Sequence, residues 1–210
     1  DVFEEASGEP ENVTAALRDG RRYAQTWRRK KLVPLESQPG SLPPVLRQGG
    51  TYLVTGGLGG LGLVAAERLA RLCKPNLVLL GRSGLPPRRD WDEWVALHGE
   101  SDPTSRRIAQ VRELETLGAE VLVVAADVTN VEQMRQAIGA ARDRFGAIHG
   151  VLHTAGTVAD ALLQMKSLTE VEDVFAPKIH GTLVIDELLG SDPQLDFMLL
   201  YTSTSTAVAP

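Results

Sequence analysis

The stretch TYLVTGGLGGLG, residues 51–62, places five glycines within seven positions directly after a short apolar run. It satisfies two patterns at once, GxGxxG from Gly57 and TGxxxGxG from Thr55. Such a turn between a strand and a helix lets the backbone approach a diphosphate, which then meets amide groups and the positive end of the helix. The sequence therefore predicts a dinucleotide site, and a ligand-free turn is the alternative. The residues expected there are Thr55, Gly56, Gly57, Leu58, Gly59, Gly60, Leu61 and Gly62.

The end of the next apolar run indicates which dinucleotide binds. At this position, about 20 residues after the glycines, an acidic side chain would accept a hydrogen bond from the ribose hydroxyl of NAD. The chain instead carries Arg82, followed by Ser83. Because a guanidinium fork suits a phosphate, we expect these two residues to bind the phosphorylated ribose of NADPH. A solvated arginine at a strand end is the alternative.

Two further strand ends carry candidate cofactor residues. Asp127 and Val128 end the run AADV. Asp127 could accept a hydrogen bond from the adenine amino group or cap the following turn, and both interpretations stay open. The run GVLHTAG ends in small residues that would let the nicotinamide ribose approach. Its candidates are His153, Thr154, Ala155 and Gly156, and for the histidine a place in the core or behind the cofactor is favoured over a general base.

Five apolar runs, at residues 52–55, 76–82, 120–128, 150–156 and 196–203, predict the strands that position these residues. The runs are apolar almost throughout, which is typical of strands buried on both faces. Amphipathic segments lie between them. The pattern therefore predicts an α/β fold, a Rossmann-type doubly wound parallel sheet with helices on both faces.

Local signals predict where helices begin and end. Thr129 and Glu132 indicate a capping box before a helix that stops at Gly146. A second helix stops at Gly118, and its apolar residues are Ile108, Val111, Leu114 and Leu117.

Residues 83–105 form an unusually long connection. Trp91, Trp94 and Leu97, at three-residue spacing, predict one short amphipathic helix within it, which the tryptophans would anchor by packing alone.

The N-terminal residues follow another pattern. Residues 12–33 predict a β-hairpin that turns at Asp19 and Gly20. Residues 34–50 carry four prolines and three glycines, which is typical of a linker, and we expect a boundary near residue 48.

Composition narrows the functional classes. With 210 residues and a net charge of -5, the chain lacks the basic excess that nucleic acid or an anionic membrane surface would require. The single Cys73 excludes an internal disulfide and a cysteine-based zinc cluster, and the four histidines show no metal-ligand spacing, so we expect a cytoplasmic protein without a metal. No apolar run reaches the ~18 residues of a membrane span.

Six motifs, in their order and context, resemble a ketoreductase domain of a modular type I polyketide synthase, a relative of the short-chain dehydrogenases/reductases. They are VTGGLGGLG, LLGRSG, the AADV strand end, GVLHTAG, PKIHGT and LLYTSTS. The resemblance implies that residues 49–210 form the NADPH-binding catalytic subdomain, and residues 1–48 the tail of a structural subdomain and a linker. It implies reduction of a β-keto group on an acyl carrier protein, with hydride from NADPH and with neighbouring synthase domains as further partners.

The resemblance also implies site residues. Lys178 in PKIHGT matches the active-site lysine, which would hold the cofactor and lower the pKa of a tyrosine proton donor. Ser203 matches the serine that hydrogen-bonds the substrate carbonyl, with Ser205 as its rival. Asp160 aligns with the last aspartate of a signature for B-type ketoreductases, which set the D-configuration, although the two residues before it differ.

The same resemblance places the family's catalytic tyrosine and the asparagine of YxxxN after residue 210. We therefore expect the last strands of the subdomain to lie outside this sequence, the strand at 196–204 to be an apolar edge, and the fragment alone to be inactive. Two alternatives remain: a structural remnant that no longer reduces, and a free short-chain dehydrogenase, against which the long N-terminal segment argues.

Overall fold

The computed structural model describes residues 15–26, 28, 42–159 and 161–203. The chain divides into two compact units, Asp1–Gln38 and Pro39–Pro210. The smaller unit contains an antiparallel hairpin of β1 (Ala15–Arg18) and β2 (Arg21–Ala24). Its turn confirms the predicted one.

Both turn residues, Asp19 and Gly20, have positive φ angles, of 50° and 68°. A two-residue turn of this kind matches the right-handed twist of the strands that it joins. The remainder of the predicted hairpin, residues 12–14, 27 and 29–33, lies outside the described residues.

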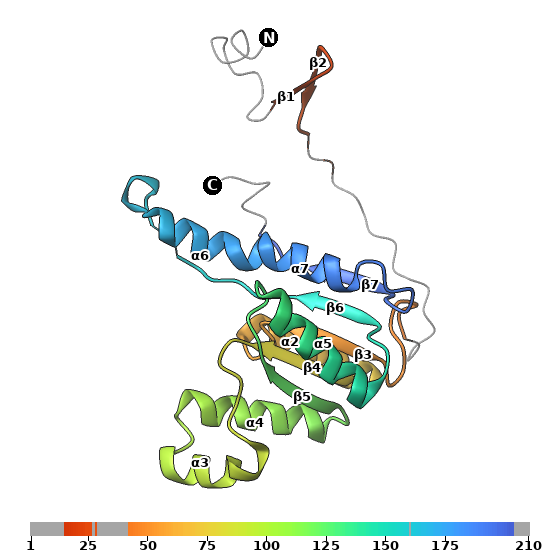
Figure 1. Cartoon of the computed structure of the whole chain (residues 1–210), viewed down its shortest axis with the longest axis vertical. Coiled ribbons are helices and arrows are strands. Elements are labelled where there is room, and N and C mark those ends of the chain that lie inside the picture. The colour runs from red at the N-terminus through yellow and green to blue at the C-terminus, as the bar shows by residue number, and fades with distance from the viewer. Residues whose placement is uncertain (1–14, 27, 29–41, 160, 204–210) are drawn as a thin grey trace. The chain divides into compact units, whose positions relative to one another are not determined.

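The larger unit is built on a parallel sheet of five strands in the order β5-β4-β3-β6-β7 (Figure 1). This confirms the predicted doubly wound α/β fold, since the order reverses between β3 and β6. The strands are β3 (Thr51–Thr55), β4 (Asn76–Gly81), β5 (Glu120–Ala125), β6 (Gly150–His153) and β7 (Phe197–Leu200). Four of them end earlier than predicted: β4 by one residue, and β5, β6 and β7 by three residues each, at residues 125, 153 and 200.

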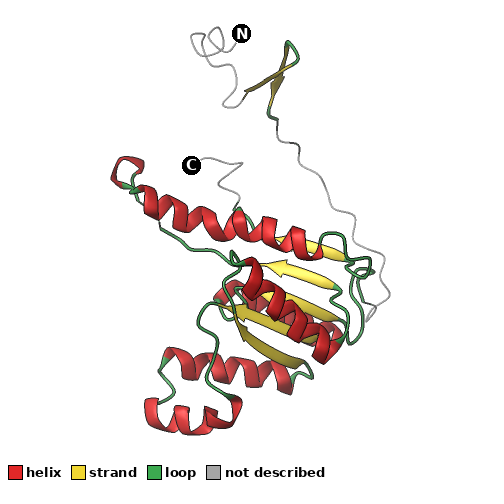
Figure 2. Ribbon diagram, in the orientation of Figure 1, coloured by secondary structure: helices red, strands yellow, loops and turns green. Residues whose placement is uncertain are grey.

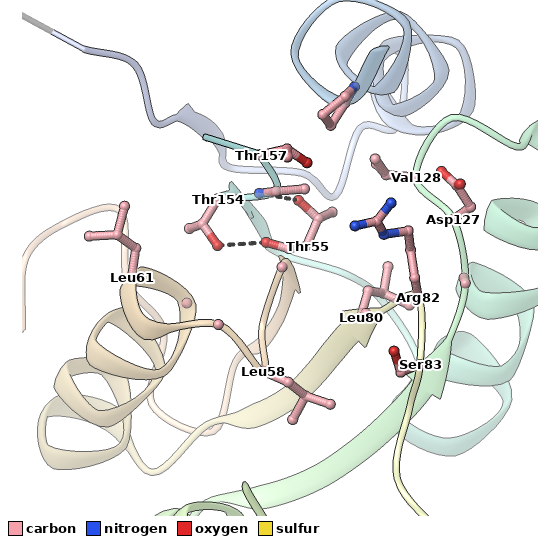
Figure 3. Close-up of a pocket in the computed structure, with 18 of the residues that line it drawn as sticks. Thr55, Leu58, Leu61, Leu80, Arg82, Ser83, Asp127, Val128, Thr154 and Thr157 are labelled. Atoms are coloured by element: carbon pink, nitrogen blue, oxygen red, sulfur yellow. Dashed lines mark hydrogen bonds between the residues drawn. The ribbon is translucent and has the colours of Figure 1, made fainter. Parts of the chain in front are cut away.

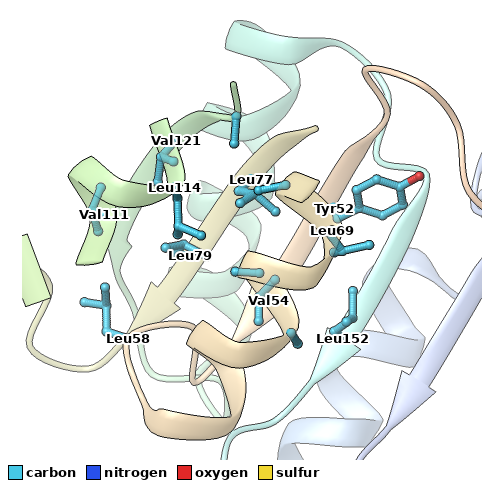
Figure 4. Close-up of a cluster of buried hydrophobic side chains, with 14 of the residues drawn as sticks. Tyr52, Val54, Leu58, Leu69, Leu77, Leu79, Val111, Leu114, Val121 and Leu152 are labelled. Carbon is cyan, nitrogen blue, oxygen red and sulfur yellow. The ribbon is translucent and has the colours of Figure 1, made fainter. Parts of the chain in front are cut away.

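Helices cover both faces of the sheet (Figure 2). On one face, α2 (Gly60–Cys73) and α4 (Pro103–Thr116) pack on strand residues such as Val54 and Leu79, and Figure 4 shows this cluster. On the other face, α5 (Val131–Phe145) and α7 (His180–Leu189) pack on the alternate residues, such as Leu53. Each inner strand therefore buries both of its faces, which explains its continuous apolar run.

The start of α5 corrects one prediction. The N-cap is Asn130, whose side chain accepts a hydrogen bond from the Gln133 amide. The amide and hydroxyl of Thr129 instead donate to the carboxylate of Asp127, so the capping box predicted from Thr129 and Glu132 is wrong. The stop signal is confirmed, because Gly146 follows α5 at a φ of 79°.

The predicted second helix is α4, and Ile108, Val111 and Leu114 are buried. Leu117 packs against the same core and Gly118 follows at a φ of 94°. These positions confirm the predicted apolar face.

The long connection after β4 contains η1 (Arg88–Asp90) and then α3 (Trp91–His98), which confirms the predicted short helix. Trp91 is buried, and Trp94 is partly buried against the same core. Leu97 was expected on the packed side, but it is 77% exposed. Trp94 and Val95 pack against the core but Leu97, near the end of α3, does not, so the predicted stripe stops before it.

The chain after β6 passes through η2 (Leu163–Met165) to α6 (Leu168–Lys178), which buries no residue. A capping box of Ser167 and Glu170 starts α6, and Pro177 lies in its last turn. The final strand, β7, is an edge of the sheet with Leu199 and Leu200 almost half exposed, as expected for the apolar run there.

Candidate cofactor site

A cavity of about 660 Å³ lies at the carboxyl ends of β3, β4, β5 and β6 (Figure 3). Parallel α/β sheets bind their ligands at this edge, next to the point where the strand order reverses. Most of the sequence-predicted cofactor residues line it. They are Thr55, Gly56, Leu58, Gly59, Gly60, Leu61, Gly62, Arg82, Ser83, Asp127, Val128, Thr154, Ala155 and Gly156.

The glycines of the loop serve two purposes. Gly56 has a φ of 67°, and a Cβ there would lie 2.9 Å from the Cα of Ala155. A Cβ on Gly57 would lie 2.7 Å from the carbonyl oxygen of Val54, so these two glycines allow the loop to pack on its neighbours. At Gly60, which lines the cavity, a Cβ would meet no atom within 4 Å. That glycine leaves space for a ligand.

The start of α2 faces this space without a side-chain cap. Its N-cap is Gly59, with no capping hydrogen bond, and its first turn has no acidic residue. By contrast, Asp102, Asn130 and Ser167 cap α4, α5 and α6. The first amides of a helix have no acceptor within the helix, and its dipole attracts an anion to them. The residues present therefore fit the diphosphate of a dinucleotide.

Arg82 and Asp127 approach the cavity from neighbouring strand ends, β4 and β5 (Figure 3). The Oδ1 of Asp127 accepts from the Thr129 amide at 2.9 Å and from its hydroxyl at 2.8 Å. The turn interpretation of Asp127 is therefore observed. It does not compete with the adenine interpretation, because the turn occupies one carboxylate oxygen only.

His153 lies behind the cavity and does not line it, which agrees with a role in the core. It is buried, and its Nε2 lies 2.8 Å from the carbonyl oxygen of Pro177 while its Nδ1 lies 2.6 Å from the hydroxyl of Thr55. Since a carbonyl only accepts, Nε2 carries the proton and Nδ1 accepts from Thr55. Burial lowers the pKa of His153, which favours this neutral form.

Lys178, at the end of α6, reaches across to the chain after β7. Its Nζ donates to the carbonyl oxygen of Tyr201 at 2.9 Å, and burial lowers its pKa. A Cβ on Gly156 would lie 3.0 Å from the Cε of Lys178, so the lysine passes over the cavity residue Gly156. Gly57 and Lys178 do not line the cavity themselves. Ser203 is exposed and follows Tyr201 by two residues, whereas Asp160 and Ser205 lie outside the described residues.

Sequence reasoning missed two charged residues of the cavity, Arg107 and Asp173. Arg107 lines it from α4, and Asp173, Ala176 and Pro177 line it from α6. The only signal for Arg107 was its place next to Ile108 in the apolar pattern of α4.

The described parts of the chain contain no group of three His, Cys, Asp or Glu side chains that could hold a metal ion. In those same parts, none of the helices is both long enough and apolar enough to span a membrane.

Comparisons with known proteins agree on one family. The model of the KR domain matches residues 50–209. The 6-methylsalicylic acid synthase of Penicillium patulum is 37% identical over 182 residues, which are 86% of this chain and 10% of that protein. Polyketide synthase PksM of Bacillus subtilis is 37% identical over 163 residues, 78% of this chain and 3% of that protein.

Solved structures that resemble this chain are also ketoreductases. A ketoreductase domain from the bacillaene assembly line superposes with a TM-score of 0.77 at 28% identity, over 100% of this chain and 44% of that one. An A1-type ketoreductase superposes with a TM-score of 0.72 at 26% identity, over 98% and 38%. The chain thus spans less than half of these structures and a tenth or less of those two synthases.

Proposed function

Because this chain belongs to the KR domain family, we propose that it is an NADPH-dependent reductase of polyketide assembly. Its relatives include polyketide synthases, and its structural neighbours include ketoreductases from such assembly lines. The proposed substrate is the β-keto group of an acyl chain on an acyl carrier protein, and the product is the β-hydroxyl. The neighbouring domains of a synthase would be its other partners.

The observation that carries this proposal is the cavity at the strand ends, with an uncapped helix start on one side and an arginine on another. The space at Gly60 and the first amides of α2 would hold the diphosphate. Arg82 would hold the 2′-phosphate, and the second carboxylate oxygen of Asp127 the adenine amino group. Thr154 and Gly156 would face the nicotinamide ribose.

When bound, NADPH would supply the hydride, and the chain would supply position and charge. The amine of Lys178 would hold the cofactor and lower the pKa of a tyrosine proton donor, which by resemblance follows residue 210. Ser203 would hydrogen-bond the substrate carbonyl oxygen, where negative charge develops. General acid catalysis by such a proton donor is typically worth ~10² to 10⁴ in rate.

We also propose the assignment of residues 1–48 to the tail of a structural subdomain and a linker. Within the larger unit, Leu42 and Leu46 of that segment pack against the core of the sheet. Arg47 forms a bidentate pair with Asp196, with both N···O distances at 2.6 Å. The end of the linker is thus attached to the strand unit before β3 begins.

The first experiment is a titration of the folded chain with NADPH and NADH by calorimetry. We expect saturable binding of both, with NADPH at least about tenfold tighter, since one charged contact to a phosphate is worth about 1.5–3 kcal/mol. A folded chain that binds neither dinucleotide would overturn the proposal.

The second experiment uses the domain extended through the expected tyrosine motif, with NADPH and a β-ketoacyl thioester on an acyl carrier protein. Turnover supports the reductase. Normal cofactor binding without turnover would favour a structural remnant, and activity restricted to small free ketones would favour a free dehydrogenase.

A further inference from the structure

Two arginines line the cofactor cavity, and they come from different parts of the chain. Arg82 follows β4, whereas Arg107 lies in α4, beyond the long connection that contains α3. The chain leaves the carboxyl end of β4, passes through α3 and α4, and returns to the amino end of β5. The first turns of α4 therefore lie at the carboxyl edge of the sheet, beside β5 (Figure 1).

Neither arginine has a carboxylate partner among the residues that the structure describes. Most arginines of the larger unit do form ion pairs within 4.0 Å, namely Arg47, Arg71, Arg88, Arg89, Arg112, Arg135, Arg142 and Arg144. Two carboxylates line the same cavity, those of Asp127 and Asp173, and neither forms an ion pair with an arginine of the described ranges; the Oδ1 of Asp127 is engaged by Thr129. The guanidinium groups of Arg82 and Arg107 are thus available to an anionic ligand.

The packing of α4 fixes the direction of Arg107. Ile108 is 0% exposed in the core, while Arg106 is exposed. Successive helical residues point about 100° apart, so Arg107 lies at the flank of the buried face and Arg106 on the opposite, outer side. One cation therefore reaches the cavity and its neighbour does not.

The long connection supports this placement. Asp102 caps α4 by accepting from the amides of Thr104 at 2.9 Å and Ser105 at 2.8 Å. The same carboxylate accepts from the indole of Trp94 at 3.2 Å, so it joins α3 to the start of α4. The connection therefore positions the helix that carries the second cation.

We propose that Arg107 and Arg82 together bind the 2′-phosphate of NADPH, so that α4 contributes to the choice of NADPH over NADH. The inference rests on the proposed function. A phosphate monoester carries between one and two negative charges at neutral pH, which one guanidinium does not fully neutralise. A second guanidinium would supply the remaining positive charge.

The test compares Arg107→Gln with Arg106→Gln, its neighbour on the outer face, in the same chain. Calorimetry would measure the dissociation constants of NADPH, NADH, 2′,5′-ADP and 5′-ADP. We expect Arg107→Gln to weaken NADPH and 2′,5′-ADP by about tenfold or more and the two ligands without a 2′-phosphate by less than about twofold. Arg106→Gln should change none of the four.

The outcomes separate the inference from the proposed function. Unchanged NADPH binding in Arg107→Gln, or equal losses for NADPH and NADH, would overturn the inference while dinucleotide binding stands. Failure of the unaltered chain to bind any dinucleotide would instead overturn the proposed function. Far-ultraviolet circular dichroism checks folding, and Arg107→Met, which keeps an apolar stem, gives the same contrast if Arg107→Gln unfolds.

Discussion

The substitutions Gly60→Ala and Gly57→Ala test two different roles of glycine in the loop. Gly60 is expected to leave space for a ligand, whereas Gly57 allows the loop to pack on the strands. A methyl group at Gly60 meets no atom within 4 Å. Gly60 is also the first residue of α2, where alanine is the better helix former. We expect the free energy of unfolding to stay the same or to rise by up to about 1 kcal/mol.

The same methyl group would occupy the place where a diphosphate approaches the helix start. If the ligand is displaced at a cost of about 1–3 kcal/mol, the dissociation constant of NADPH rises about 5- to 150-fold. At Gly57 the methyl group would lie 2.7 Å from the oxygen of Val54 and 2.9 Å from the Cα of Leu79. Because both are backbone atoms of buried strands, we expect a loss of stability of about 1–3 kcal/mol or more.

The assays are calorimetric titration with NADPH and thermal denaturation of both variants. A loss of 1 kcal/mol lowers Tm by about 2–4 °C in a chain of this size. The reasoning is refuted if folded Gly60→Ala binds NADPH within twofold of the unaltered chain. It is also refuted if Gly57→Ala is as stable as Gly60→Ala, since the packing contacts would then not explain the glycine.

Three further changes test other contacts. Burial lowers the pKa of His153, so as the pH falls the unfolded chain binds a proton at this residue before the folded chain does. The free energy of unfolding should therefore decrease below about pH 6.5, by at most about 1.4 kcal/mol per pH unit. Urea unfolding measured across this pH range should show a shallower pH dependence of the free energy of unfolding in His153→Gln. Asp102→Ala removes the cap of α4 and the acceptor of the Trp94 indole, and Tm should fall by roughly 2–4 °C in a thermal scan; an unchanged Tm would show that the cap does not stabilise α4. Arg82→Gln should weaken NADPH by about tenfold and spare NADH in the calorimetric titration, and equal losses would count against a phosphate contact.

Local pattern was sufficient to predict the sheet and the place of the cavity. The inner strands are buried on both faces, so their apolar runs were continuous and easy to recognise. The glycine run has few explanations other than a tight strand-to-helix turn, and the motif from Thr55 to Gly62 lies there on the cavity. The alternation of strands and helices then determined which strand ends meet.

The features that were missed depend on contacts between distant segments. Whether Thr129 or Asn130 caps α5 depends on backbone angles and on the carboxylate of Asp127, which recruits the threonine instead. The exposure of Leu97 depends on how little of α3 reaches the core. Arg107 could be assigned to the cavity only from the orientation of α4 on the sheet, because Arg107 lines the cavity and the adjacent Arg106 does not.

The hydrogen bond from His153 to Pro177 has a consequence for the adjacent amine. Although α6 buries none of its residues, the carbonyl group of Pro177, just before Lys178, accepts a hydrogen bond from His153 of the inner strand β6. The position of the Lys178 amine is therefore set by the contact with β6 rather than by the packing of α6. We therefore expect substitutions along the outer turns of α6 to leave the position of that charge unchanged.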